Sequence, residues 1–299
     1  MRLLAAWWLA VASAAWGQGL WESRAPYPLR ATEVSAAVIG DLIYAMCGLT
    51  ATGSTSAVFV YDPRTDAWRD AAPLPAAGDH CNVAAVEGRL YMLGALSALG
   101  DGTTYEYDPQ LNRWQAVGRM GTPRGASGVA AIGSKIYVAG GLAGGRSVAD
   151  FAAFDPATRT WERLPNMPVE LDHLTAQAVD GKFYAIAGRA GGIDAGREPT
   201  AEYDPPSRTW RLRAPIPVPR GGLGSGVIAG RIIVFGGEGQ SGRPERTYAE
   251  NHEYDPATDS WRPLARMDSP ARPLRGQPRW AGVHAVGRSH CRSFLLRRS

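Results

Sequence analysis

The sequence predicts an all-β fold built from four-stranded antiparallel units that repeat along the chain. Its clearest motif is an aromatic residue, then Asp-Pro, then Trp five residues after the Pro. The Trp residues of this motif lie 46, 47, 49 and 51 positions apart, and a period near ~50 residues is typical of repeat proteins. The 36 Gly and 22 Pro among 299 residues indicate many turns. The motifs start at Tyr61, Tyr107, Phe154, Tyr203 and Tyr254 and end at Trp68, Trp114, Trp161, Trp210 and Trp261.

Each copy contains four short strand signals separated by Gly or Pro, which is the pattern of an antiparallel meander. In the third copy the expected strands cover residues 126–132, residues 136–139, residues 148–154 and a segment that opens at Trp161. Two features mark the second strand of each copy: an aromatic or aliphatic residue within it and a pair of small residues after it. The pairs are Cys47-Gly48, Gly94-Ala95, Gly140-Gly141, Ala187-Gly188 and Gly236-Gly237, and the strand residues are Tyr44, Tyr91, Tyr137, Tyr184 and Ile233.

Paired small residues after a strand, then Tyr-Asp-Pro and a spaced Trp, resemble kelch repeats over roughly residues 21–265. The resemblance implies a kelch-type β-propeller, whose four-stranded blades surround a central channel. We expect each Trp to bury an apolar face between blades, the paired Gly to allow positive φ, and Asp-Pro to set a turn. These roles are structural, so the repeated residues are poor candidates for chemistry.

A further Trp extends the series and sets the expected number of blades. Trp21 precedes Trp68 by 47 residues, and the segment after it resembles the one after Trp210. Six Trp strands predict a six-bladed propeller in which a terminal strand completes a blade begun at the other terminus and hides sheet edges.

The last of these blades lacks most of its expected strand signals in the sequence. Residues 271–299 are rich in Arg, Pro and Ser, and only residues 282–287 resemble a first strand. A frameshift near Ala271, a genuine truncation, or a tail that folds in another way would each explain this segment. The expected organisation is therefore a propeller over residues 18–270 followed by an atypical tail.

Residues 1–17 have the features of a secretory signal peptide. Arg2 precedes an uncharged apolar run, and small residues offer cleavage after Ala14 or after Gly17. The run is shorter than the ~20 residues that a membrane helix needs; a membrane anchor is the alternative. We expect an exported protein, periplasmic or secreted, without a membrane span after cleavage.

The net charge of +4 does not indicate a nucleic-acid partner. Seven Arg lie in residues 271–299 and one in the signal, which leaves −4 for residues 18–270. That region has no basic stripe or aromatic platform suited to phosphates.

Candidate ligand-binding residues follow from the blade topology. The loops before the first strand and after the second strand of each blade share one face, and their sequences differ between copies, as binding loops do. Counting back from the second strands predicts a mostly cationic ring at the channel mouth, suited to an acidic or hydroxyl-rich ligand. Its members are Arg30, Glu33, His80, Arg124, His173, Arg189, Arg220 and Glu238.

The alternative is that these polar side chains only satisfy backbone groups or face water. His80 and His173 could also exchange protons near neutral pH. Asp79 and His80 are adjacent and would point to opposite sides of a strand, so we do not expect them to form a catalytic pair by themselves.

Two enzyme classes share a fold of this kind. Copper-radical oxidases that resemble galactose oxidase need two Tyr, two His and a Tyr–Cys crosslink at copper. The body of this chain has only His80, His173 and His252, of which His252 lies in a third strand, and no matching Tyr and Cys constellation. A sugar-acid mutarotase would suit the Arg, His and Glu ring, although none of its motifs transfers. We expect no cofactor, no metal and, from the residues, a monomeric binding module for a protein or carbohydrate; a sugar-acid mutarotase or epimerase is the alternative.

The three Cys residues allow one bridge. Cys47 ends a second strand and Cys81 begins the next first strand, both toward the variable face. In an exported protein they could form a disulfide, or they could remain buried thiols. Cys291 would be unpaired.

Overall fold

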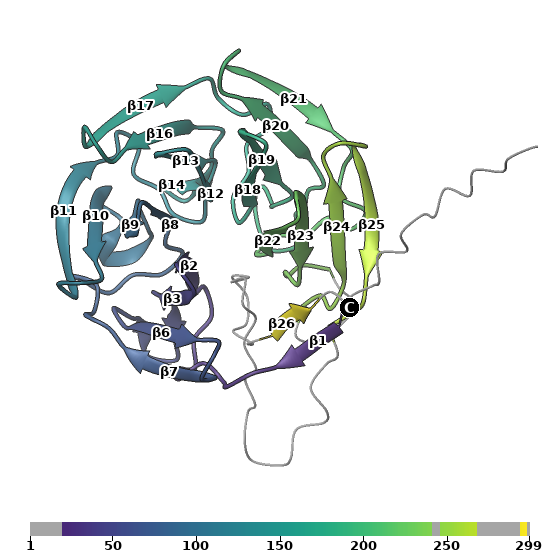
Figure 1. Cartoon of the computed structure of the whole chain (residues 1–299). Coiled ribbons are helices and arrows are strands. Elements are labelled where there is room, and N and C mark those ends of the chain that lie inside the picture. Colours follow the sequence, from purple (N-terminus) through teal and green to yellow (C-terminus); the bar gives the residue numbers. More distant parts are fainter. Residues whose placement is uncertain (1–19, 241–245, 268–293, 298–299) are drawn as a thin grey trace, which may run out of the picture.

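The computed structural model describes residues 20–240, 246–267 and 294–297. The predicted signal peptide (residues 1–17), the segment that resembles a first strand (residues 282–287) and Cys291 lie outside these ranges. The described residues form five four-stranded antiparallel sheets arranged as blades in a ring, and each sheet runs from an inner strand at the centre to an outer strand at the rim (Figure 1). The chain is thus an all-β propeller. A 3-10 turn, η1 (Ser97–Leu99), is the sole helix among the described residues, so none of their helices could cross a membrane.

The strands of the blades are as follows, from the inner to the outer strand. The first blade has β2 (Ser35–Ile39), β3 (Leu42–Met46), β6 (Val58–Asp62) and β7 (Ala67–Asp70). The second has β8 (Val83–Val86), β9 (Arg89–Met92), β10 (Thr103–Asp108) and β11 (Arg113–Arg119). The third has β12 (Gly128–Ile132), β13 (Lys135–Ala139), β16 (Phe151–Asp155) and β17 (Thr160–Leu164).

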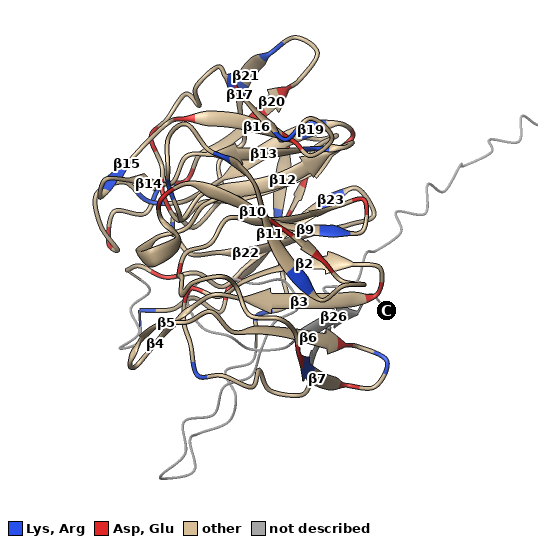
Figure 2. Ribbon diagram, turned by 90° about the vertical axis from the view of Figure 1, so that its left-hand side faces the viewer, with Lys and Arg blue, Asp and Glu red and all other residues tan. Residues whose placement is uncertain are grey.

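The fourth blade has β18 (Thr175–Val179), β19 (Lys182–Ile186), β20 (Thr200–Asp204) and β21 (Thr209–Arg213). The fifth has β22 (Gly224–Ile228), β23 (Arg231–Phe235), β24 (Asn251–Asp255) and β25 (Ser260–Leu264). Two small hairpins, β4 (Leu49–Thr50) with β5 (Gly53–Ser54) and β14 (Leu142–Ala143) with β15 (Arg146–Ser147), project on the same side of the ring (Figure 2).

The strand register explains the repeated motif. The aromatic residue of each motif lies directly opposite its Trp across the third and fourth strands, as Tyr61 does opposite Trp68. The two rings of that pair have centroids 5.0 Å apart. The Asp-Pro turn between them is what brings the two strands into this register. The motif is therefore a hairpin with an aromatic cross-strand pair, which stabilises the outer half of each blade.

The Trp indole also joins neighbouring blades. The Nε1–H group of Trp114 donates to the carbonyl of Ala72, four residues after the Trp of the preceding blade, at 3.0 Å. The same spacing recurs for Trp68 with Ala25, Trp210 with Pro165 and Trp261 with Ala214. Trp161 differs and donates to Thr104 Oγ1, next to a register shift in β10. These bonds and the buried side chains between adjacent blades form the core.

The expectation of six four-stranded blades is corrected to five. In place of the sixth, between β25 and β7, lies a two-stranded sheet in which β1 (Leu20–Ser23) pairs with β26 (Phe294–Arg297) (Figure 1). The structure therefore places Trp21 in a strand that pairs with a strand from the other end of the chain. The described residues supply no other strands to this sheet.

The paired small residues adopt positive φ in four of the five copies. Gly141 has φ +111°, and a Cβ there would lie 2.5 Å from the Gly125 carbonyl oxygen. Such a conformation and such an approach suit glycine. In the second copy the register aligns Gly94 with Gly140, and Gly94 has φ +126°, whereas Ala95 is not among the residues with positive φ.

Candidate binding site at the channel mouth

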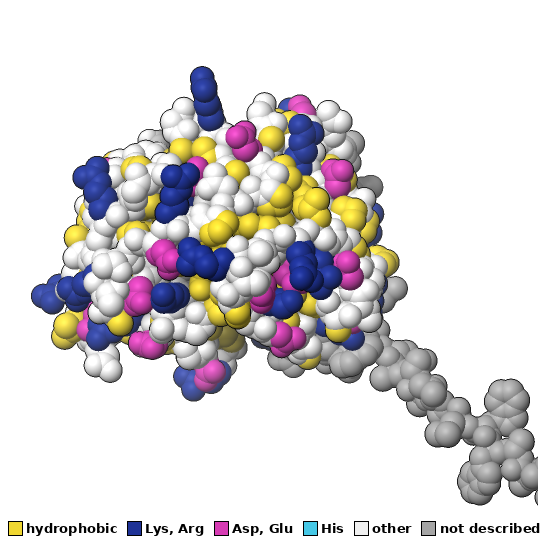
Figure 3. Space-filling view, turned by 90° about the horizontal axis from the view of Figure 1, so that it is seen from above, with side chains coloured by type: hydrophobic (Ala, Val, Ile, Leu, Met, Phe, Trp, Pro, Cys, Tyr) yellow, Lys and Arg dark blue, Asp and Glu magenta, His cyan; other side chains and the backbone are white. Residues whose placement is uncertain are grey.

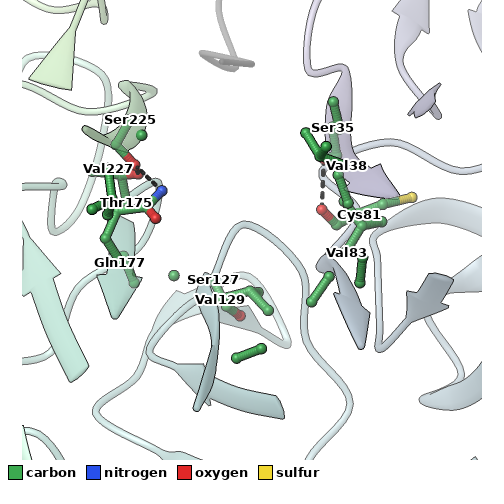
Figure 4. Close-up of a pocket in the computed structure, with 18 of the residues that line it drawn as sticks. Ser35, Val38, Cys81, Val83, Ser127, Val129, Thr175, Gln177, Ser225 and Val227 are labelled. Atoms are coloured by element: carbon green, nitrogen blue, oxygen red, sulfur yellow. Dashed lines mark hydrogen bonds between the residues drawn. The ribbon is translucent and has the colours of Figure 1, made fainter. Parts of the chain in front are cut away.

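The central channel contains a cavity of about 450 Å³ lined by the five inner strands (Figure 4). Its walls are mostly small and apolar, with a few polar side chains. Ser35 Oγ donates to the carbonyl of Cys81 at 2.6 Å, and Gln177 Nε2 donates to Ser225 Oγ at 2.9 Å. These hydrogen bonds cross from one blade to the next, so the polar groups of the wall hold the blades together.

A ring of backbone positions lies just before the inner strands, at one end of this cavity. The five residues share positive φ, between 51° and 65°. Hydrogen bonds between blades connect several of them: the Ala126 amide donates to the His80 carbonyl, His173 to Ala126, and Gly222 to His173. The ring is therefore rigid, and only the side chains differ between blades. Its positions are Glu33, His80, Ala126, His173 and Gly222.

The two loops of each blade meet at this ring, as the topology predicts. The residue before each ring position pairs with the residue that follows the small pair, as Asp79 does with Leu96, Asp172 with Arg189, and Gly221 with Glu238. Loops that are separate in sequence therefore present their side chains side by side.

Each ring histidine is held by the aspartate before it. His80 Nδ1 lies 2.5 Å from Asp79 Oδ1, and His173 Nδ1 lies 2.5 Å from Asp172 Oδ1. The expectation that adjacent Asp and His point apart is wrong, because the positive φ of each His takes it out of the strand geometry. Since an ionised carboxylate only accepts hydrogen bonds, Nδ1 of each ring carries a proton, and in a neutral ring of this tautomer the lone pair lies on Nε2.

Serine hydroxyls fix the aspartates in turn. Ser54 Oγ donates to Asp79 Oδ2, and Ser147 Oγ donates to Asp172 Oδ2, each at 2.5 Å. Ser97 also donates to Asp79. Ser54 and Ser147 come from β5 and β15, the two hairpins on the same face. The same Ser–Asp–His arrangement therefore occurs twice, before the inner strands of the second and the fourth blade.

These hydrogen bonds keep both aspartates ionised. Burial alone would raise the pKa of Asp79, but the hydrogen bonds from His80, Ser54 and Ser97 lower it to about 2. Burial opposes ionisation of Asp172 as well, and its hydrogen bonds from His173 and Ser147 nonetheless keep its pKa below the usual value.

Glu33 joins the two histidines. Its Oε2 lies 3.3 Å from His80 Nε2, and the rings of His80 and His173 meet edge to face with centroids 4.8 Å apart. One ligand atom from each of the three residues lies within 4.8 Å of those of the other two. Their side chains are largely buried, with exposed fractions of 9% for Glu33, 13% for His80 and 2% for His173. The spacing of these residues in sequence did not indicate such a cluster.

Arg189 and Glu238 extend the network, as members of the predicted ring. Arg189 Nη1 lies 2.5 Å from Glu238 Oε1, and its Nε lies 3.3 Å from Asp172 Oδ1. The structure thus brings together five of the predicted residues: Glu33, His80, His173, Arg189 and Glu238.

The structure does not place Arg124 and Arg220 at a ligand surface. Both are buried, and they donate to backbone carbonyls: Arg124 to Gly140, Thr122 and Val138, and Arg220 to Gly236, Val218 and Glu250. Burial lowers the pKa of each to about 10. These arginines connect the loops of one blade, which is a structural role.

Arg30 is exposed, and it lies one residue before the position that Arg124 and Arg220 occupy in their blades. The expected cationic ring is therefore corrected. The network at the mouth contains four carboxylates, those of Glu33, Asp79, Asp172 and Glu238, against one guanidinium. Signals that could have revealed it are the repeated Asp-His pair and the serines 25 residues before each aspartate.

Cys47 and Cys81 form a disulfide in the structure, with Cα atoms 6.3 Å apart. It joins the end of β3 in the first blade to the residue after His80, so it lies next to the mouth. On one side of the molecule, basic and acidic side chains are interspersed (Figure 3).

Comparisons with known proteins agree with this fold. The model of the KLHDC2/KLHL20/DRC7 Kelch-repeats domain matches residues 117–284, and that of the Kelch motif matches residues 30–75. The solved structure of YjhT is similar with a TM-score of 0.68 and 18% identity over 81% of this chain and 86% of that chain. At that identity the likeness shows the fold alone.

Two curated relatives match in sequence. Kelch-like protein terF of Aspergillus terreus is 30% identical over 259 residues, which are 80% of this chain and 56% of terF. Kelch-like protein 35 of Mus musculus is 34% identical over 84 residues, 28% of this chain and 14% of that protein. The chain therefore spans about half the length of the first relative and less of the second. With a family model that matches more than half of it, the chain belongs to the kelch-repeat family.

Proposed function

We propose that the protein is a binding module that takes its ligand at the channel mouth. A kelch propeller supports protein binding in general, because its rigid blades present variable loops on one face. The ligand class that fits this mouth is a protein segment that presents a basic side chain. Carbohydrate binding remains part of the proposal, since hydroxyl-rich ligands also suit carboxylates.

One observation supports this choice: the side chains at the mouth include four carboxylates but only one guanidinium. Arg189 pairs with Asp172 and Glu238, and Glu33 and Asp79 both contact His80 in the same network. A surplus of negative charge beside a low-dielectric wall attracts cations and repels anions. Arg189 is held between Glu238 and Asp172, so it neutralises part of the charge rather than offering a free cationic site.

The alternative is a sugar-acid mutarotase or epimerase that uses the same residues. Two imidazoles held by carboxylates are suited to general acid–base catalysis, which favours this alternative. The acidic mouth disfavours it, because an anionic sugar would approach a surplus of carboxylates.

The test is a binding screen with basic peptides, acidic peptides, neutral sugars and sugar acids. We expect basic peptides to bind, and Glu238→Gln to weaken that binding at least several-fold. The matched control is Glu162→Gln, because Glu162 is a half-exposed glutamate that pairs with an arginine away from the mouth, Arg208. Binding of sugar acids with interconversion of their anomers would establish the alternative. Equal binding by both variants would overturn the mouth as the site.

Export and a monomeric state are further parts of the proposal. The Cys47–Cys81 disulfide supports export, since disulfides persist in oxidising compartments. Fractionation of cells that express the full chain, with size measurement of the exported product, tests both.

A further inference from the structure

We propose that Glu33, His80 and His173 form a binding site for a divalent transition-metal ion, zinc or a metal of similar preference, at the channel mouth. The three residues come from the first, second and fourth blades, whose inner strands surround the same channel. This inference is independent of the proposed ligand, because it concerns three residues and a metal alone.

The donor set is the first argument. Two imidazole nitrogens and one carboxylate oxygen form a set that proteins use for zinc, with a fourth position left for water or a ligand. In a tetrahedral site with bonds of ~2.0–2.1 Å, two donor atoms lie ~3.3 Å apart. His80 Nε2 and Glu33 Oε2 lie 3.3 Å apart, and all three donor atoms lie within 4.8 Å of one another. A modest inward rotation of side chains would complete the geometry.

The tautomer of the histidines is the second argument. Asp79 and Asp172 each accept from Nδ1, which leaves Nε2 of each neutral ring as a lone-pair donor. A carboxylate that holds the far nitrogen of a metal-binding histidine is a recurrent feature of metal sites, because it fixes the ring and raises its basicity. Here this feature occurs for both histidines, and each aspartate is itself held by a serine.

Charge and rigidity are the third argument. The carboxylates of Glu33, Asp79 and Asp172 lie next to the two imidazoles. The guanidinium of Arg189, which lies 3.3 Å from Asp172, offsets only part of their negative charge. A divalent cation bound here would neutralise the excess negative charge of these carboxylates. The ring positions have positive φ in non-glycine residues, at Glu33, His80 and His173. Ala126 has the same conformation at the equivalent position of its blade, so the fold itself fixes the backbone from which these three side chains extend.

The alternative is a purely structural role, in which the three residues form a hydrogen-bonded cluster that joins the blades. In that case a proton between His80 Nε2 and Glu33 Oε2 would take the place of the metal. The two hypotheses differ in one measurable property: only a metal site binds added metal with a defined stoichiometry.

The test uses the full chain, freed of metal by chelator, and titrates it with Zn²⁺ and with Co²⁺. We expect one equivalent to bind, the Co²⁺ form to show visible absorption bands of a low-coordinate site, and Zn²⁺ to raise the melting temperature by mass action. His80→Asn and His173→Asn remove Nε2 and keep a side-chain N–H near the aspartate, so they should abolish the absorption and weaken Zn²⁺ binding more than 10-fold. Asp172→Asn, a positioning variant, should weaken binding by ~10–100-fold.

His252→Asn is the matched control, because His252 lies in β24, contacts Arg220 and is not one of the three proposed ligands, so this variant should bind metal as the wild type does. Absence of a bound equivalent in the wild type would overturn the proposal. So would equal binding by the His80 and His252 variants, provided both melt cooperatively. Loss of peptide binding in Glu238→Gln with metal binding intact would leave the metal site standing, so the two proposals fail separately.

Discussion

His80 and His173 lie two blades apart in the sequence, yet their rings meet edge to face at 4.8 Å, each held by the aspartate before it. The pair is formed because the closed ring brings equivalent positions of alternate blades to a common axis. No local pattern of the chain requires this meeting. The contact shows that the residues that differ between copies converge at the mouth.

Arg124 is expected to be a stability residue. Arg124→Met leaves the carbonyls of Gly140, Thr122 and Val138 without their donor, which should lower the free energy of unfolding by about 3 kcal/mol. Urea unfolding measures the loss. Arg30→Met, at an exposed site, should change it by less than ~0.5 kcal/mol. If Arg124→Met lost ligand binding but kept its stability, Arg124 would instead belong to the cationic ligand-binding ring that the sequence predicted.

Gly141 is expected to tolerate no side chain. Gly141→Ala places a Cβ 2.5 Å from the Gly125 carbonyl oxygen at φ +111°, and we expect a fall in stability of more than ~2 kcal/mol. The comparison is Gly145→Ala, where φ is also positive (+78°) but no atom lies within 4 Å of the added Cβ. That change should cost about 1 kcal/mol. Equal melting temperatures of the two variants would contradict the close approach.

The disulfide is expected to contribute to stability. The bridge closes a loop of 34 residues in sequence, and loop-closure entropy then predicts about 3–4 kcal/mol. Intact mass should rise by two hydrogen atoms when the protein is reduced, and the Cys47→Ser/Cys81→Ser variant should unfold at lower denaturant. An unchanged mass upon reduction would show that the thiols are free.

Stability is expected to depend on pH through His252. Burial, and then the charge of Arg220, lowers the pKa of His252 to about 4, whereas the unfolded chain has an imidazole pKa near ~6.5. Between these values the unfolded state binds a proton that the folded state does not, so stability is full above pH ~6.5 and falls as pH drops to about 4. This contribution is about 3 kcal/mol at most.

The measurement is denaturant unfolding at pH 7 and pH 5 for the wild type and for His252→Asn. The difference between the two pH values should be smaller in the variant, because one group that titrates differently in the two states has been removed. Other carboxylates and histidines contribute to both proteins alike. An identical difference in the two proteins would contradict the assignment.

The sequence determined most of the fold because the repeated motif is local. The Asp-Pro turn, the aromatic residue and the Trp lie within one hairpin, and a hairpin is set by neighbours in the chain. The kelch resemblance, the antiparallel blades and the Trp positions follow from it. The number of complete blades did not, because closure depends on strands supplied from both ends of the chain, and the described residues place only two strands there.

The candidate site was predictable in part. Counting along the copies identified Glu33, His80, His173, Arg189 and Glu238, because the loops of equivalent copies have equivalent places. It also selected Arg124 and Arg220, whose side chains turn inward to bind backbone carbonyls, since burial cannot be read from spacing. The sign of the charge at the mouth, the contact within each Asp–His pair and the three-residue cluster became evident only in the tertiary structure, although the Asp-His dipeptide itself recurs in the sequence. Their physical reason is the closed ring, which sets positive φ at the mouth and brings separate blades within hydrogen-bonding distance.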